Sequence, residues 1–159
     1  MRMAQRDHHE QDKQDEPRTG ESVAPARTDM PASVLVVEDD AVLALLIETT
    51  LMEAGTARIR HCRTTQAALE ALREERPDAI VLDVHLADRD DGWAIAELVS
   101  EVGPRPPRIV FSTGAPQDIP EDIASMGVVL EKPYAPEDLI AAVTARKRGL
   151  LSRLIKARS

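Results

Sequence analysis

Several kinds of residue are scarce in this 159-residue chain, and each scarcity excludes a class of protein. The single cysteine, Cys62, excludes an internal disulfide framework and is typical of a protein kept in a reducing compartment. The longest apolar run, residues 41–47, falls far short of the ~18 residues of a membrane span. The first residues are polar and charged, which excludes a secretory signal. We therefore expect a soluble, cytoplasmic protein.

Aromatic residues are also rare, at 2% of the chain, and comprise Trp93, Phe111 and Tyr134. Hydrophobic residues nevertheless make up 43% of the sequence, so the core must be aliphatic. The length is enough for one domain with a core of its own and some chain to spare.

Charge is distributed unevenly along the chain. Residues 31–145 hold nine basic and twenty-one acidic side chains, a net charge of −12, so duplex DNA is not the expected ligand of this part. Residues 1–31 are polar and contain almost no large apolar side chain, and we expect them to form a disordered leader. Residues 149–159 belong to a basic C-terminal tail, which leaves residues 32–148 as the folded domain.

Strand-like and helix-like segments alternate in this domain. Apolar, β-branched runs predict strands, and apolar residues at helical spacing predict helices. The predicted strands are 33–37, 57–62, 78–83, 108–112 and 128–131, and the predicted helices are 41–55, 64–77, 92–103, 121–127 and 136–149. Such a (βα)5 order implies an α/β fold in which helices cover both faces of a doubly wound, five-stranded parallel sheet.

Ionisable or hydroxyl groups follow four of the five predicted strands. Glu38 and Asp39 follow the first, Asp83 the third, Thr113 the fourth and Lys132 the fifth, whereas the second, an edge strand, is followed only by residues 62–63. Ligands bind at the carboxyl ends of strands in sheets of this kind. Crowded acids raise one another's pKa unless a cation joins them, and a hard ion such as Mg²⁺ suits carboxylates. Asp83 would then be a nucleophile for phosphoryl transfer, with Thr113 and Lys132 as partners of the phosphoryl oxygens.

Four segments contain these residues: "VLVVEDD" (34–40), "IVLDVHL" (80–86), "FSTG" (111–114) and "EKPY" (131–134). They resemble, in the same order, the signatures of response regulator receiver domains from two-component signalling. The resemblance spans about residues 33–148. It implies a flavodoxin-like fold with strand order 2-1-3-4-5.

The resemblance also implies a role for each matching residue. Asp83 corresponds to the phosphoacceptor, Thr113 to the switch hydroxyl and Lys132 to the lysine that pairs with the phosphoryl group. The Lys132–Pro133 peptide bond corresponds to one that is cis in the family. For Mg²⁺, the implied ligands are Glu38, Asp39, Asp83 and the backbone carbonyl of His85. Asp40 is read as the cap of the first helix.

Two departures from the family pattern affect how phosphorylation would be reported. Val129 stands where the family usually has a tyrosine or phenylalanine, three residues before the lysine. The loop after Asp83 is about one residue longer than usual. "FSTG" is also similar to a variant group of stand-alone receivers with Phe-x-Thr-Gly at this strand end.

The resemblance implies a signalling switch rather than an enzyme with a separate substrate. A histidine kinase or phosphotransfer protein would phosphorylate Asp83, and a downstream protein would bind near helix four, strand five and helix five. No DNA-binding domain is expected after residue 148. A phosphorylation-independent pseudo-receiver, acting as an adaptor, is the alternative. An aspartate-nucleophile hydrolase is a third class, but His85 stands where such enzymes have a second acid.

The basic tail has two interpretations. Leu150, Leu151, Leu154 and Ile155 lie among six cations of residues 146–159, a pattern that suits an anionic membrane or nucleic acid. The plainer interpretation is a helix end with cations favoured by the helix dipole. We favour the plainer one and do not expect membrane contact.

Overall fold

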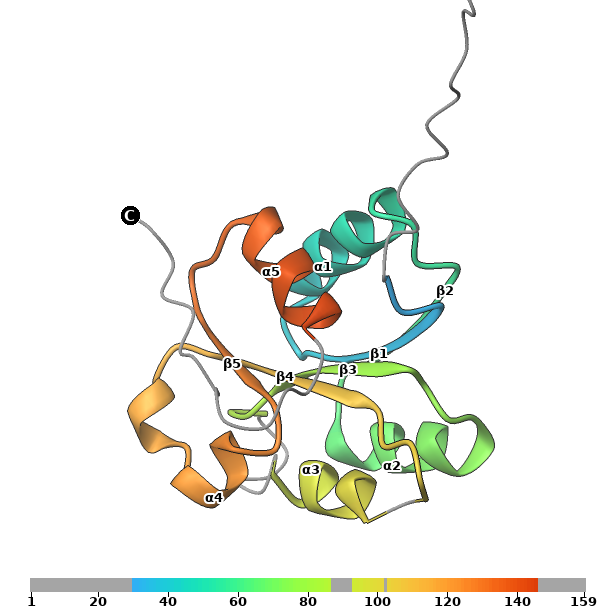
Figure 1. The fold of residues 1–159 in the computed structure, drawn as a ribbon. Coiled ribbons are helices and arrows are strands. Elements are labelled where there is room, and N and C mark those ends of the chain that lie inside the picture. The colour runs from blue at the N-terminus through green and yellow to red at the C-terminus, as the bar shows by residue number, and fades with distance from the viewer. Residues whose placement is uncertain (1–29, 87–92, 102, 146–159) are drawn as a thin grey trace, which may run out of the picture.

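The computed structural model describes residues 30–86, 93–101 and 103–145. Within these ranges strands and helices alternate as the sequence predicts, and Figure 1 traces them from blue to red. The strands are β1 (Ser33–Val37), β2 (Arg58–Cys62), β3 (Ala79–Asp83), β4 (Arg108–Thr113) and β5 (Val128–Glu131). The helices are α1 (Ala41–Glu53), α2 (Thr65–Glu74), α3 (Trp93–Ser100), α4 (Glu121–Ala124) and α5 (Pro136–Thr144), with a 3-10 turn η1 (Pro116–Asp118).

The described strands form one parallel sheet in the order β2-β1-β3-β4-β5. The predicted fold class and strand order are therefore confirmed. The chain reverses its direction of winding between β1 and β3, where Val37 pairs with Leu82. The residues that follow these two strands are thus neighbours at the carboxyl edge of the sheet, the place where open α/β sheets bind ligands.

Helices cover both faces of the sheet. Figure 1 shows α1 and α5 on one face and α2, α3 and α4 on the other. Every residue of β1 and β3 is buried, and their alternating side chains supply a core on each face. Val36 and Val81 pack toward α1 and α5, and Leu35, Ile80 and Phe111 belong to the core under α2 and α3. The core is mainly aliphatic, as the scarcity of aromatic residues predicts.

Most helices are shorter than the sequence predicts, because backbone hydrogen bonding rather than composition decides where a helix ends. The Asp40 carboxylate caps α1 by accepting from the amides of Val42 and Leu43 at 2.9 and 3.0 Å, as expected. α1 then ends at Glu53, two residues before Gly55 with its φ of 112°. α2, predicted to reach residue 77, ends at Glu74, and α4, predicted to reach residue 127, ends at Ala124.

Some predictions concern residues outside the described ranges. These are the disordered leader up to residue 29, the lengthened loop at residues 87–92 and the basic tail at residues 149–159. The boundaries of the domain at residues 32 and 148 remain a prediction. Among the described residues, no helix has the length and apolar character needed to cross a membrane.

Candidate functional site

Three acidic residues converge at the carboxyl edge of the sheet. Glu38 and Asp39 directly follow β1, and Asp83 is the last residue of β3. Carboxylate oxygens of these three residues lie within 4.8 Å of one another. Glu38 and Asp83 are buried, with only 1% and 5% of their surface exposed. The neighbouring positions of β1 and β3 in the sheet thus bring together residues that are 45 positions apart in the sequence.

Lys132, the first residue after β5, lies between the two buried carboxylates. Its Nζ is 3.1 Å from Glu38 Oε2 and 3.4 Å from Asp83 Oδ2. Burial disfavours the charged ammonium, but the charges of Asp83 and Glu38 and their hydrogen bonds outweigh it and raise the pKa of Lys132 above its ordinary value. Lys132 is therefore a fixed positive charge in this site.

Backbone amides bind the other oxygen of each buried carboxylate. The Asp40 amide donates to Glu38 Oε1 at 3.1 Å, and the His85 amide donates to Asp83 Oδ1 at 2.9 Å. Burial raises the pKa of Glu38, the Asp40 amide opposes this, and the charge of Asp83 adds to the rise. Each carboxylate thus has a hydrogen-bond partner, as buried polar groups require, but the site keeps more negative than positive charge.

Thr113 ends β4 and is completely buried. Its carbonyl accepts from the Lys132 amide at 2.7 Å, which fixes the strand ends of β4 and β5 side by side. Its Oγ1 accepts from the Ala115 amide at 3.0 Å. The Lys132–Pro133 peptide bond is cis, as the family resemblance implies.

β2 contributes to this site, although its strand end alone suggested that it does not. His61 Nε2 lies 2.7 Å from the carbonyl oxygen of Glu38, and its Nδ1 lies 3.5 Å from Glu48 on α1. Arg63 Nη2 donates to the carbonyl oxygen of Asp39 at 3.4 Å. These contacts fix the backbone on which the acids are carried. These contacts depend on the register of β1 with β2, which pairs Val37 with Cys62 and does not follow from the strand ends alone.

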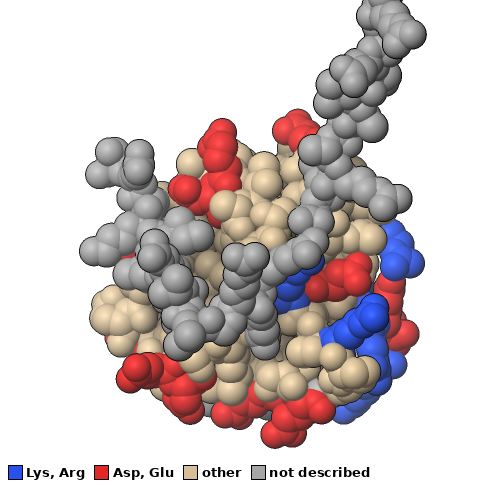
Figure 2. Space-filling view, in the orientation of Figure 1, with Lys and Arg blue, Asp and Glu red and all other residues tan. Residues whose placement is uncertain are grey.

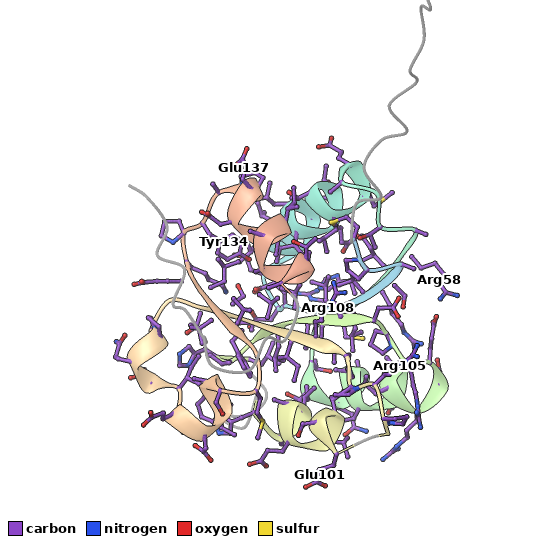
Figure 3. All side chains as sticks on the ribbon, viewed as in Figure 1. Arg58, Glu101, Arg105, Arg108, Tyr134 and Glu137 are labelled. Atoms are coloured by element: carbon purple, nitrogen blue, oxygen red, sulfur yellow. The ribbon has the colours of Figure 1, made fainter. Side chains whose placement is uncertain are left out.

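Tyr134 is a further residue near this site to which the sequence assigned no role. Its hydroxyl lies 3.0 Å from Ser112 Oγ of β4, and Figure 3 shows the ring beside α5 on the side toward β5. Burial raises the pKa of Tyr134, and the hydrogen bond with Ser112 only partly opposes it. Val129, at the position usual for an aromatic switch, is buried in the core under α4.

The donor set fits a hard divalent cation. All three side chains offer carboxylate oxygens, which are the ligands that Mg²⁺ prefers. Two of the carboxylates are buried, and a single lysine pairs with both of them. A cation would offset the charge that Lys132 leaves unbalanced, so the residues present are suited to hold such an ion.

Comparison with known proteins agrees with this arrangement. The profile of the response regulator receiver domain family matches residues 34–144. The response regulator MprA of Mycolicibacterium vanbaalenii is 31% identical over 128 residues, which cover 78% of this chain and 52% of MprA.

Solved structures are similar as well. A response regulator from Burkholderia pseudomallei, crystallised with a phosphorylated aspartic acid, a calcium ion and citrate, is 25% identical with a TM-score of 0.58 over 70% of this chain and 65% of that one. A receiver protein from Sinorhizobium medicae is 28% identical with a TM-score of 0.59 over 71% of this chain and 91% of that one.

The chain spans about half the length of the curated relatives that it matches. The match nevertheless includes all five strands and every residue of the acidic site. The chain belongs to the response regulator receiver domain family.

Proposed function

We propose that this chain is a phosphorylation-dependent signalling switch whose phosphoacceptor is Asp83. Receiver domains of response regulators serve two-component signalling in this general way. The observation that carries the proposal is the position of Asp83, a buried carboxylate at a strand end, close to two further acids and 3.4 Å from the Lys132 ammonium. A cap or a surface acid would need no such surroundings.

The proposed reaction transfers a phosphoryl group from a phosphohistidine of a histidine kinase or phosphotransfer protein. A carboxylate oxygen of Asp83 attacks phosphorus, the bond from phosphorus to the imidazole nitrogen breaks, and that nitrogen keeps the electron pair. The product is an acyl phosphate on Asp83. Lys132 and the Thr113 hydroxyl are the groups that would bind the phosphoryl oxygens and stabilise their negative charge.

In this proposal Glu38, Asp39, Asp83 and the backbone carbonyl of His85 hold Mg²⁺. When bound, the ion offsets the charge of the acids and of the phosphoryl oxygens. The His85 amide already lies against Asp83, so the chain after β3 folds back toward this site. The similar protein from Burkholderia pseudomallei carries a phosphorylated aspartic acid together with a divalent cation, which supports the pairing.

We propose that the output is binding to a partner protein, or onward transfer of the phosphoryl group. The partner would use the face formed by α4, β5 and α5, to which the phosphoryl-binding Lys132 and Thr113 are joined through the chain. Phosphorylation would draw these strand ends together and shift an existing equilibrium between two states. With Val129 at the usual aromatic position, that shift would proceed without an aromatic rotation.

The test is incorporation of phosphate from acetyl phosphate in the presence of Mg²⁺. We expect the parent protein to be labelled and Asp83→Asn to remain unlabelled, because its amide cannot act as the nucleophile. Asp122→Asn is the matched control, since Asp122 is an exposed acid on α4. Undiminished labelling of Asp83→Asn would refute the assignment. A parent protein that takes no phosphate from this donor or from any kinase would instead indicate the pseudo-receiver adaptor.

A further inference from the structure

A pocket of about 490 Å³ lies between α2 and α3, and its size is typical of sites that hold small molecules. Pro77 precedes β3 and Pro107 precedes β4, so the pocket lies at the amino edge of the sheet, opposite to the acidic site. Leu98 is 48% exposed, and no other large apolar side chain of the described residues outside α1 is as exposed. The apolar residues that line the pocket are Leu69, Leu72, Pro77, Leu98, Val99 and Pro107.

Three arginines line this pocket from two sides. Arg73 belongs to the last turn of α2 and Arg76 follows that helix, whereas Arg105 lies in the connection from α3 to β4. Figure 2 shows basic side chains gathered on one side of the molecule, and Figure 3 shows Arg105 on that side. The dipole of α2 favours a cation in its last turn and so accounts for Arg73, but it does not account for an arginine on the opposite wall.

The acidic residues of the pocket are already paired. Glu74 binds Arg60 and Glu75 binds Arg58, and both of these arginines belong to β2. Among the described residues, no acidic side chain forms an ion pair with any of the three arginines of the pocket. The other acids of α2, of α3 and of the residue after α3 do not line the pocket; they are Glu70, Glu97 and Glu101. The positive charge of the arginines therefore remains available to a ligand.

Gly103 leaves room for one of these arginines. Its φ of 80° lies in the left-handed region that glycine favours, and a Cβ at this position would lie 3.2 Å from Arg76 Nη1. The guanidinium of Arg76 thus lies close to the connection that carries Arg105. Arginines from the two walls of the pocket are brought toward each other by this arrangement.

We propose that this pocket binds a small amphiphilic anion, in which a carboxylate or phosphate head is joined to an apolar body. The apolar body lies against the leucines, and the head accepts hydrogen bonds from the arginines, because a guanidinium binds such oxyanions through two parallel hydrogen bonds. A polar anion or an uncharged apolar molecule would match only one half of this lining. The pocket shares no residue with the acidic cluster, so the inference does not depend on phosphorylation of Asp83.

The test is a titration of the nitrogen-15-labelled full chain with hexanoate and with hexyl phosphate, followed by amide chemical shifts in NMR. We expect saturable shifts that are largest in the last turn of α2, in α3 and at residues 103 and 105. 1-Hexanol has the same apolar body without a charged head, and it should bind at least about fivefold more weakly. The head that binds more tightly identifies the ligand as a carboxylate or a phosphate, and either result supports the proposal.

Variants separate the two halves of the lining. Arg105→Gln should weaken hexanoate binding about fivefold, because a charge-assisted hydrogen bond is lost. Arg63→Gln is the matched control, since Arg63 is an exposed arginine at the opposite edge of the sheet and its loss changes the net charge equally. Leu98→Glu should abolish binding by placing a carboxylate in the pocket, whereas Leu45→Glu, on the exposed face of α1, should leave it unchanged.

Four outcomes would overturn the proposal. Shifts confined to α1, and lost in Leu45→Glu rather than in Leu98→Glu, would place the anion on the exposed face of that helix. Equal affinity for hexanol and hexanoate would show that the arginines do not take part. Equal loss in Arg105→Gln and Arg63→Gln would reduce the effect to net charge. The absence of saturable shifts with both anions would exclude this class of ligand.

Discussion

At the scale of single residues, Lys132 has to be understood together with the acids it pairs with. One ammonium lies within 3.4 Å of two buried carboxylates, and each carboxylate also accepts from a backbone amide. Breaking a buried ion pair by removing one partner leaves a costly unpaired charge. The two buried carboxylates and the lysine therefore stabilise one another only when all three are present. A bound cation or a phosphoryl group would change the charge balance of this cluster.

His61 is the residue whose role is most open to direct measurement. The ring contacts the carbonyl of Glu38 at 2.7 Å and so fixes the backbone between two acids of the site. Partners of metal ligands commonly contribute 10–100-fold to affinity. We therefore expect His61→Leu to weaken Mg²⁺ binding by about tenfold or more in titration calorimetry, and His61→Gln, which keeps a donor, to lose less.

Arg60→Gln is the matched control for His61, since Arg60 is the preceding residue of β2 but is exposed and pairs with Glu74. It should leave Mg²⁺ affinity unchanged. Parent-like affinity of His61→Leu would show that the contact with Glu38 does not position the acids.

Tyr134 provides a test of burial at the rim, because the chain has no other tyrosine. Burial raises its pKa above the ordinary value of about 10. The folded state therefore holds the phenolic proton to higher pH, and this group makes the free energy of unfolding fall as pH rises above that ordinary value. In an ultraviolet titration, phenolate should form at higher pH in the folded chain than in urea.

Ser112→Ala sharpens this measurement. The hydrogen bond with Ser112 lowers the pKa of Tyr134, so its removal should move phenolate formation to still higher pH. Identical midpoints in the folded and urea-unfolded chains would contradict the burial of Tyr134 described above.

At the scale of elements, Gly114 directly follows β4 and Gly127 directly precedes β5, and the two positions differ in whether they have room for a side chain. A Cβ on Gly127 would lie 2.3 Å from the carbonyl oxygen of Ile109, a backbone atom that cannot move aside, whereas a Cβ on Gly114 meets no atom within 4 Å. Gly127→Ala should therefore lower the free energy of unfolding by about 1–3 kcal/mol. Gly114→Ala should change it little. Urea unfolding of both variants is the measurement, and an equal loss in the two would contradict this packing.

The same elements show what sequence patterns can and cannot predict. The limits of β1 and β5 follow from their apolar runs. Glu38, Asp83 and Lys132 were found because each stands at the carboxyl end of a predicted strand. The end of α2 was not found, since it depends on where Glu75 becomes extended. The role of His61 was missed because it depends on the register between β1 and β2, a contact across 23 residues of sequence.

At the scale of the whole molecule, charge is separated along the sequence and exposed apolar surface is concentrated on one helix. The sequence joins an acidic domain to a basic tail, and most of the large apolar residues that the described domain exposes lie on α1. In the view of Figure 2, acidic side chains lie at the top and the bottom of the molecule, and basic side chains gather on one side. Contiguous apolar patches on soluble proteins favour contact between molecules, so α1 is the surface to test for self-association.

The exposed apolar residues of α1 should promote self-association at high protein concentration, because uncovered apolar patches favour contact between molecules. We expect the mass of the chain in size-exclusion chromatography with light scattering to rise with concentration. Leu45→Glu should restore a single mass, since it interrupts the exposed face at a residue that is 64% exposed. Leu98→Glu is the matched control on α3 and should not restore it. A parent chain that keeps one mass at every concentration would show that the face of α1 does not drive contact between molecules.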